Sequence, residues 1–251
     1  MSAKVAVVTG ASSGIGRALA GELAKAGYRL GLIARRRELL DEVAGEVRSR
    51  GGTAEVAAAD VADRDQVLAA VAELTRRLGP VDLLVANAGV GVPTRLDPPN
   101  VPEQVAMIGV NVFGVMYAVE AVLPDMLRRG SGQVAAISSL AAYKGIPGSG
   151  AYSASKAAVN NYMESLRIQC YGRGVAFTTV CPGFIRTPMI AHNKERLLME
   201  MPADRAARLI VRAIGRKAKV YDFPRPMAIL MRLTWLMPDR TVWRRVRDGL
   251  K

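Results

Sequence analysis

Lys4–Gly16 reads KVAVVTGASSGIG, and this stretch predicts how the chain begins to fold. The apolar run Val5–Val8 has the length and composition of a buried strand. From Ile15 onward apolar residues recur at helical spacing, so the glycine-rich stretch between the two is a strand-to-helix turn. Glycines let bare backbone N–H groups approach a pyrophosphate at the start of a helix. The stretch therefore predicts a dinucleotide-binding turn; the alternative is a plain connection between strand and helix.

The rest of the chain continues this alternation of short apolar runs and helical patterns. Its 251 residues suit one α/β domain, and half of them are apolar, which is enough for a full core. Strands that alternate with helices form a parallel sheet. We therefore expect a single doubly wound Rossmann-type domain over residues 1–223, with a parallel sheet of about seven strands flanked by helices. The expected strands are Val5–Val8, Leu30–Ala34, Ala54–Ala58, Leu83–Ala86, Gln133–Ser138, Ala176–Cys181 and Lys219–Phe223, and two of the expected helices are Arg64–Leu78 and Ala151–Tyr171.

A second stretch, SLAAYKGIPGSGAYSASK from Ser139 to Lys156, carries side chains suited to proton transfer. Tyr152 and Lys156 are four residues apart, so on a helix they share one face. Free tyrosine has a pKa of about 10, and an ammonium beside it lowers that pKa. A serine hydroxyl aimed at the same point can hold a carbonyl oxygen. The stretch predicts a metal-free site that interconverts C=O and CH–OH; the alternative is a chance pattern on a surface helix.

With these residues in place, the chain resembles the short-chain dehydrogenase/reductase family over roughly residues 4–222. Six motifs carry the resemblance in order: Thr9–Gly16, Asp60-Val61, Asn87-Ala88-Gly89, Asn111 within VNVFG, the set Ser139, Tyr152 and Lys156, and Pro182–Thr187. The glycine spacing G-x-x-x-G-x-G differs from the usual Rossmann fingerprint. The resemblance implies that the cofactor is bound by Gly10, Ser12, Ser13, Gly14, Ile15, Gly16, Arg35, Asp60, Val61, Asn87, Ala88, Gly89, Tyr152, Lys156, Pro182, Gly183, Ile185 and Thr187.

The resemblance also implies a role for each catalytic residue. Tyr152 exchanges a proton with the carbonyl or alcohol oxygen, and Ser139 orients and polarises the carbonyl. Lys156 lowers the pKa of Tyr152 and binds the nicotinamide ribose. Asn111 is expected to hold a water that links Lys156 to solvent as a proton relay. Without the other motifs, the preferred interpretation of Asn111 would be a helix N-cap.

The residues after the second expected strand favour one cofactor. An NAD enzyme usually places an acidic residue near this point to hold the ribose 2′-hydroxyl, and here the position holds Ala34. The guanidinium of Arg35 suits a 2′-phosphate. We therefore expect NADPH or NADP+ as cofactor, with NAD(H) second; the alternative is that Arg35–Arg37 is a solvated helix start. Ser13 departs from the pattern, because many NADP-dependent family members carry a basic residue there, so the expected preference is mild.

Small and medium apolar residues surround the catalytic motifs. They predict a lipophilic ketone, aldehyde or alcohol as the substrate. A second hypothesis is a catalytically silent dinucleotide-binding protein with a regulatory or scaffold role on the same fold, and the complete set of Ser139, Tyr152 and Lys156 argues against it. The residues expected to line the substrate side are Val90, Leu140, Tyr143, Ile146, Phe184 and Met189.

Composition and the start of the chain predict an intracellular protein without a metal site. The first expected strand begins close to Met1, so we expect no signal peptide and a cytoplasmic location. The two cysteines, Cys170 and Cys181, are expected to be reduced core residues. His192 is the single histidine, which makes zinc or Ser-His-Asp chemistry improbable, and it is expected on a loop.

The C-terminal extension, residues 224–251, lies outside the resemblance. The formal net charge is +13, and from Arg205 to the end thirteen Lys/Arg stand against three Asp, a net +10. The apolar stretch 227–237 is too short to span a bilayer, and a second helix is expected from Asp239. Basic, apolar segments that carry tryptophan (here Trp235 and Trp243) suit a membrane interface. We therefore expect peripheral contact with an anionic membrane; the alternatives are a lid over the pocket or a subunit contact.

Two further expectations concern partners. No nucleic-acid-binding motif is present and the basic residues interleave with apolar ones, so we expect no nucleic acid to bind. The family resemblance implies a homodimer or homotetramer that pairs the helix after Asn111 and the helix of Tyr152 with those of a second subunit.

Overall fold

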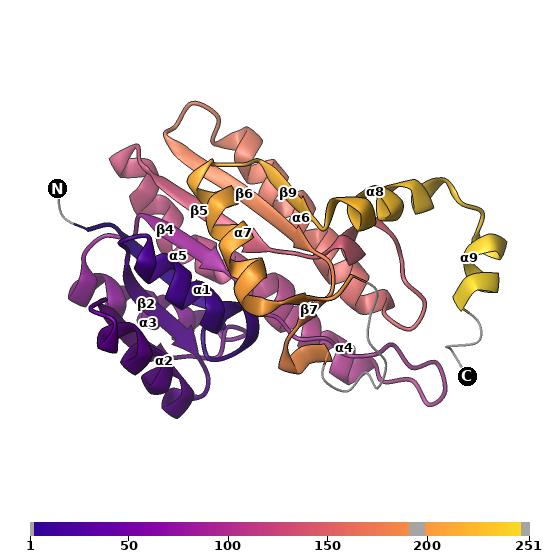
Figure 1. Cartoon of the computed structure of the whole chain (residues 1–251), viewed down its shortest axis with the longest axis horizontal. Coiled ribbons are helices and arrows are strands. Elements are labelled where there is room, and N and C mark those ends of the chain that lie inside the picture. The colour runs from indigo at the N-terminus through magenta and orange to yellow at the C-terminus, as the bar shows by residue number, and fades with distance from the viewer. Residues whose placement is uncertain (1–2, 191–198, 247–251) are drawn as a thin grey trace.

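Seven strands form one parallel sheet in the computed structural model, which describes residues 3–190 and 199–246 (Figure 1). Their order in the sheet is β3-β2-β1-β4-β5-β6-β9, so the chain runs outward from β1 to one edge and then from β4 to the other. This is the doubly wound arrangement that the sequence predicts. The strands are β1 (Val5–Thr9), β2 (Arg29–Ala34), β3 (Ala54–Ala58), β4 (Leu83–Ala86), β5 (Gly132–Ile137), β6 (Val175–Pro182) and β9 (Val220–Phe223).

The predicted elements match the observed ones closely. β3, β4 and the helix α3 (Arg64–Leu78) agree with prediction at both ends, and no other predicted end differs by more than two residues. A separate two-strand pair of β7 (Ile185–Arg186) and β8 (Met201–Pro202) was not predicted, because two-residue strands leave no periodic signal. His192, expected on a loop, lies outside the described residues.

Helices cover both faces of the sheet, as a parallel sheet requires (Figure 1). One hydrophobic core lies under α1 (Gly14–Lys25), α2 (Arg37–Ser49) and α7 (Ala203–Gly215). A second core lies on the other face, under α3, α5 (Gly114–Arg129) and α6 (Gly150–Gln169). β1, β2 and β4 in the middle of the sheet are buried along nearly their whole length as a result, whereas the edge strand β9 is only partly buried.

A long helical run joins β4 to β5. It consists of α4 (Val101–Ile108), a π-helical turn η1 (Gly109–Phe113) and α5. Among the described residues this run, Val101–Arg129, is the one helix long and apolar enough to cross a membrane by length and composition. Its apolar residues nevertheless serve the domain core, where Ala118 and Met126 are fully buried. We therefore interpret the run as a core helix.

The glycine turn between β1 and α1 forms as predicted. Gly10 and Gly14 have φ angles of +66° and +55°, a region that favours glycine. Gly16 lies in the first turn of α1 directly against the preceding loop, where an added Cβ would be 2.1 Å from the carbonyl oxygen of Gly10. The helix can begin at this position only because these residues lack side chains.

The C-terminal extension forms two short helices beyond the sheet (Figure 1). These are α8 (Arg225–Leu233), which leads into the 3₁₀ turn η4 (Thr234–Leu236), and α9 (Asp239–Val246), which begins at the predicted Asp239. α8 packs on a short 3₁₀ segment, η2 (Leu140–Tyr143). Met227 and Ala228 are buried there in a small cluster with Leu140 and Cys181. The inner side of α8 is therefore part of the folded core.

Alanine substitutions at Gly16 and Gly21 test the packing of the glycine turn within one helix. At Gly16 the new Cβ meets backbone, so we expect G16A to lower the free energy of unfolding by about 2–3 kcal/mol. At Gly21 the nearest atom, Nη1 of Arg50, would be 3.9 Å away. G21A removes a glycine from a helix interior without a clash, so it should raise the free energy of unfolding by about 0.5–1 kcal/mol. Urea unfolding followed by circular dichroism measures both; equal effects of the two substitutions would contradict this account of the turn.

Candidate active site

A cavity of about 680 Å³ lies at the carboxyl edge of the sheet. Its lining comes from the segments that follow β1, β2, β3, β4, β5 and β6, so the edge where parallel strands end supplies most of its wall. Of the residues predicted to bind a cofactor, all but Gly16 line this cavity, and Gly16 packs beneath the turn. The predicted cofactor-binding residues that line the cavity are Gly10, Ser12, Ser13, Gly14, Ile15, Arg35, Asp60, Val61, Asn87, Ala88, Gly89, Tyr152, Lys156, Pro182, Gly183, Ile185 and Thr187.

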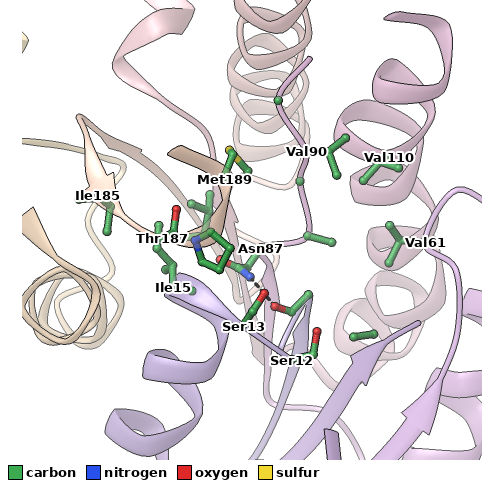
Figure 2. A pocket seen from close by; sticks show the side chains of 18 of the residues that line it. Ser12, Ser13, Ile15, Val61, Asn87, Val90, Val110, Ile185, Thr187 and Met189 are labelled. Carbon is green, nitrogen blue, oxygen red and sulfur yellow. Dashed lines mark hydrogen bonds between the residues drawn. The ribbon is translucent and has the colours of Figure 1, made fainter. Parts of the chain in front are cut away.

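Side chains from distant parts of the chain converge on this cavity (Figure 2). Ser12 and Ser13 come from the glycine turn, and Thr187 comes from the segment after β7. Val61 and Val110 lie on the opposite side of the view. The cavity therefore has a polar end at the start of α1 and a more apolar wall across from it.

Thr9 and Asn87 hold the two central strand ends together. The Thr9 hydroxyl oxygen accepts hydrogen bonds from the backbone N–H groups of Asn87 and Ala88, both at 3.1 Å. In return, the Asn87 side-chain amide donates to the carbonyl oxygen of Thr9 at 2.9 Å. Sequence reasoning missed this role of Thr9. The available signal was a hydroxyl at the end of a buried apolar strand, where a polar group needs a partner.

Two arginines stand at the rim of the cavity beside the glycine turn. Arg35 extends toward Asp60, with 3.8 Å between its Nη1 and the carboxylate Oδ2, and its side chain is 66% exposed. Arg36 donates a hydrogen bond of 3.5 Å to the hydroxyl oxygen of Ser12. Arg36 was not predicted as a site residue, although it follows Arg35 directly. The rim is thus positively charged at the end of β2, next to the buried Ala34.

Asn111 lies in the π-helical turn η1 and forms hydrogen bonds with the backbone of Val90, which lines the cavity. Its Oδ1 accepts from the backbone N–H of Val90 at 2.8 Å, and its Nδ2 donates to the carbonyl oxygen of Val90 at 3.0 Å. Nδ2 also lies 3.1 Å from the hydroxyl oxygen of Ser155. Asn111 is fully buried in the middle of a helical run, so the N-cap alternative is wrong. The proton relay through Asn111 stays a prediction.

Ser139, Tyr152 and Lys156 meet at the end of β5. Ser139 caps η2, where its hydroxyl accepts from the backbone N–H of Ala141 at 3.1 Å, and it lines the cavity together with Tyr152. Lys156 is 4% exposed; its ammonium donates to the carbonyl oxygen of Ile137 at 3.0 Å and lies 5.8 Å from the centroid of the Tyr152 ring. The three predicted residues therefore share one wall of the cavity.

The protonation of this set differs from the sequence expectation. Burial raises the pKa of Tyr152 above its usual value, and the hydrogen bond with Ser139 opposes that change without cancelling it. Burial also lowers the pKa of Lys156 to about 8. We expected Lys156 to lower the pKa of Tyr152, but in this structure desolvation of the phenol raises that pKa. Tyr152 is thus a protonated phenol near neutral pH, the form that can donate a proton.

The substrate-side prediction is only partly matched by the cavity. Val90 and Met189 line it, together with Gly91, Pro93 and Val110. The other four predicted residues are not among its lining residues: Leu140, Tyr143, Ile146 and Phe184. Leu140 packs in the small core under α8, and Phe184 is 40% exposed. The apolar residues that follow Ser139 therefore do not all line the pocket. Some of them pack against the C-terminal extension instead.

Tyr143 points to the C-terminal extension instead of the cavity. Its hydroxyl donates to Oδ1 of Asp222 at 2.9 Å and accepts from Arg232 of α8 at 3.1 Å. Arg232 also donates to Oδ2 of Asp222 at 2.7 Å and stacks 4.6 Å from the Tyr143 ring centroid. The Tyr143 hydroxyl lies 3.6 Å from the sulfur of Cys181, a buried free thiol as predicted. These contacts fasten α8 to the segment that follows Ser139.

Comparison with known protein families agrees with this geometry. The family model described as short chain dehydrogenase matches residues 4–197. The chain belongs to this family, and it is an oxidoreductase of this class with a Rossmann-type fold.

Relatives and solved structures support the same assignment. An uncharacterized oxidoreductase of Myxococcus xanthus is 37% identical over 239 residues, which cover 95% of this chain and 94% of that protein. A short chain dehydrogenase/reductase of Burkholderia phymatum in complex with NAD has a TM-score of 0.85 at 27% identity, covering 93% of each chain. An alcohol dehydrogenase of the archaeon Thermococcus sibiricus complexed with 5-hydroxy-NADP has a TM-score of 0.78 at 31% identity, covering 88% of this chain and 94% of the other.

Removal of the Arg232 guanidinium tests the attachment of α8. Arg232→Met keeps the apolar stem but removes the hydrogen bonds to Asp222 and Tyr143. Because the Arg232 side chain is 55% exposed, solvent screening limits the effect, and we expect the free energy of unfolding to fall by about 1 kcal/mol. Arg240→Met, at an exposed position of α9, is the control and should change it by less than about 0.5 kcal/mol. Equal urea midpoints for Arg232→Met and the unaltered protein would contradict the attachment.

Proposed function

We propose that the protein is an NADP(H)-dependent oxidoreductase that interconverts a lipophilic ketone or aldehyde and its alcohol. One observation carries the proposal: Ser139, Tyr152 and Lys156 line the same cavity as the glycine turn. A proton donor and a dinucleotide-binding turn in one cavity suit hydride transfer to or from a carbon that bears oxygen. The membership of the short chain dehydrogenase family supports this assignment.

The polar end of the cavity fits a nicotinamide dinucleotide. Ser13 is the N-cap of α1 but makes no side-chain hydrogen bond to the helix, so the first N–H groups of α1 have no cap from it. These donors and the positive end of the helix dipole suit a pyrophosphate. Structural neighbours in complex with NAD and with 5-hydroxy-NADP support this class of cofactor. When bound, the cofactor supplies or accepts the hydride.

The catalytic side chains then handle the proton and the oxygen. In the reducing direction Tyr152 donates its phenolic proton to the carbonyl oxygen as the carbon receives the hydride, and in oxidation it takes that proton back. The hydroxyl of Ser139 holds the same oxygen. The ammonium of Lys156 stabilises the phenolate that Tyr152 becomes and binds the nicotinamide ribose. Asn111 keeps the wall at Val90 in place through its two hydrogen bonds.

The rim charge supports NADP(H) over NAD(H). Position 34, where an acidic residue would hold the ribose hydroxyl, is a buried alanine. Arg35 and Arg36 both line the cavity beside it. A guanidinium pairs with a phosphate in a bidentate, charge-assisted manner. On the other wall Val90, Val110 and Met189 provide an apolar surface, which supports a lipophilic substrate.

Substitution of Tyr152 is the central test of the proposed reaction. Tyr152→Phe removes the proton donor and keeps the ring, so we expect turnover of NADPH with a ketone panel to fall by at least about a thousandfold, within the range of general acid catalysis. NADPH affinity, measured by fluorescence titration, should change by less than about threefold. Tyr162→Phe, on the same helix and half-buried, is the matched control and should keep its activity. Retained turnover in Tyr152→Phe would refute the assignment.

The same experiment separates the enzyme from a silent dinucleotide-binding protein. The unaltered protein should oxidise NADPH only when a carbonyl compound is added. If it binds NADPH but turns over no member of a broad panel of ketones, aldehydes and secondary alcohols, the regulatory or scaffold role becomes the better account.

A charge reversal at Arg35 tests the cofactor preference. We expect the unaltered protein to bind NADPH about tenfold more tightly than NADH, the lower end for a charge-assisted contact because Arg35 is largely exposed. Arg35→Asp should abolish or reverse this ratio. Arg37→Asp removes an exposed arginine paired with Asp41 and changes the net charge by the same amount. It should leave the ratio of NADPH to NADH affinity within about twofold of that of the unaltered protein. Equal affinities for NADPH and NADH in the unaltered protein would overturn the preference.

A further inference from the structure

Helix α8 turns one side to the domain and the other to solvent. Met227 and Ala228 are 8% and 5% exposed on the inner side. The residues on the opposite side are large, apolar and exposed: Ile229 (61%), Leu230 (53%), Leu233 (55%) and, in η4, Leu236 (74%). We call these four residues the outer face of α8. They lie close together in sequence at helical spacing, so they form one continuous apolar strip.

The outer face is held in a defined position. Arg232 fastens α8 to Asp222 at the end of β9 and to Tyr143 of η2. The inner side is packed into the cluster that contains Leu140 and Cys181. The exposed leucines are therefore presented on a folded helix, and the surface exists before any partner binds.

The segment that carries the outer face is basic in sequence. Residues 224–251 contain seven Lys/Arg and two Asp, a net charge of +5. Arg225, Arg240 and Arg244 are exposed on α8 and α9. Asp239 is 3.7 Å from the ammonium of Lys144, so a further cation offsets one of the two acidic groups. The extension thus combines the exposed large apolar side chains of the outer face with excess positive charge on α8 and α9. The side chains of Trp235 and Trp243 lie outside the described part of the structure.

This combination selects among the possible partners. A second copy of the chain in a two-fold contact would bring the same arginines against one another, and like charges oppose such a contact. A nucleic acid would satisfy the charge but leave the leucines without apolar contact. An anionic bilayer surface satisfies both, because apolar side chains enter the boundary of the acyl chains while arginines remain among the headgroups.

We propose that the outer face of α8, with Arg225, Arg240 and Arg244, binds the protein peripherally to membranes that contain anionic lipids. α8 follows the carboxyl end of β9 directly, so it lies at the edge of the sheet that also holds the cavity (Figure 1). Binding through α8 brings that end of the molecule toward the bilayer. Attraction to anionic lipid is screened by salt, and the apolar contact is much less so.

Vesicle co-sedimentation of the full-length protein tests this proposal. Vesicles of phosphatidylcholine alone are compared with vesicles of equal parts phosphatidylcholine and phosphatidylglycerol, at about 50 mM and about 500 mM NaCl. We expect the protein to sediment with the anionic vesicles at low salt, with binding at least tenfold weaker at high salt or with neutral vesicles. Recovery in the supernatant with anionic vesicles at low salt, or equal binding to both kinds of vesicle, would overturn the proposal.

Two pairs of matched variants assign the binding to this surface. Arg225→Gln/Arg240→Gln/Arg244→Gln should weaken binding on the order of a hundredfold, at roughly fivefold per charge. Arg76→Gln/Arg173→Gln/Arg216→Gln removes three exposed charges elsewhere and should weaken it by less than about fivefold. Leu233→Ser/Leu236→Ser should weaken binding by about tenfold or more, whereas Ile168→Ser/Tyr171→Ser, at exposed positions near the end of α6, should not.

Two controls separate the membrane from the other partners. The thermal unfolding midpoints of all four variants, followed by circular dichroism, establish that the variants are folded. If a variant and its matched control lose equal amounts of vesicle binding, the membrane is not bound through the outer face of α8, and the proposal is overturned. Analytical ultracentrifugation without lipid measures the mass of Leu233→Ser/Leu236→Ser; a smaller assembly than that of the unaltered protein would assign the outer face to a second copy of the chain and would also overturn it.

Discussion

The close approach of α1 to the end of β1 is the constraint on which the site depends. Gly16 lies where an added Cβ would be 2.1 Å from the carbonyl oxygen of Gly10, so the helix begins directly against the turn. This contact sets where the first N–H groups of α1 lie. The hydrogen bonds between Thr9 and Asn87 then bring the end of β4 to the same place. The position of the polar end of the cavity is consequently set by backbone packing and by the hydrogen bonds between β1 and β4.

The catalytic wall depends on a second constraint, the burial of a lysine. An ammonium away from water is unfavourable unless it has hydrogen-bond partners. Lys156 finds one in the carbonyl oxygen of Ile137, and the hydroxyl of Ser138 donates to the backbone carbonyl of Lys156. These bonds join the end of β5 to α6. Desolvation still lowers the pKa of Lys156 to about 8, so the charge near Tyr152 is sensitive to modest changes around it.

The C-terminal extension packs on the segment that follows Ser139 of the candidate site. η2 begins directly after Ser139, and the same segment supports α8 through Leu140 and Tyr143. Ser139, the proposed carbonyl-binding residue, is therefore four residues from Tyr143, which contacts Arg232 of α8. α8 therefore covers η2 beside the carboxyl edge of the sheet. The proposed role of α8 at a membrane uses only its outward side and leaves these inner contacts in place.

Local sequence determined the elements and the chemistry of this protein. Strands, helices and the glycine turn follow from patterns a few residues long, and Tyr152 and Lys156 share a face because they are one turn apart on a helix. Tertiary structure alone decided which side chains face the cavity. Tyr143 has the composition of a pocket residue, but its hydroxyl meets Asp222, 79 residues away, and Arg232, 89 residues away. Burial likewise reversed the expected change in the pKa of Tyr152. Both outcomes depend on contacts and desolvation between segments distant in sequence, which no local pattern contains.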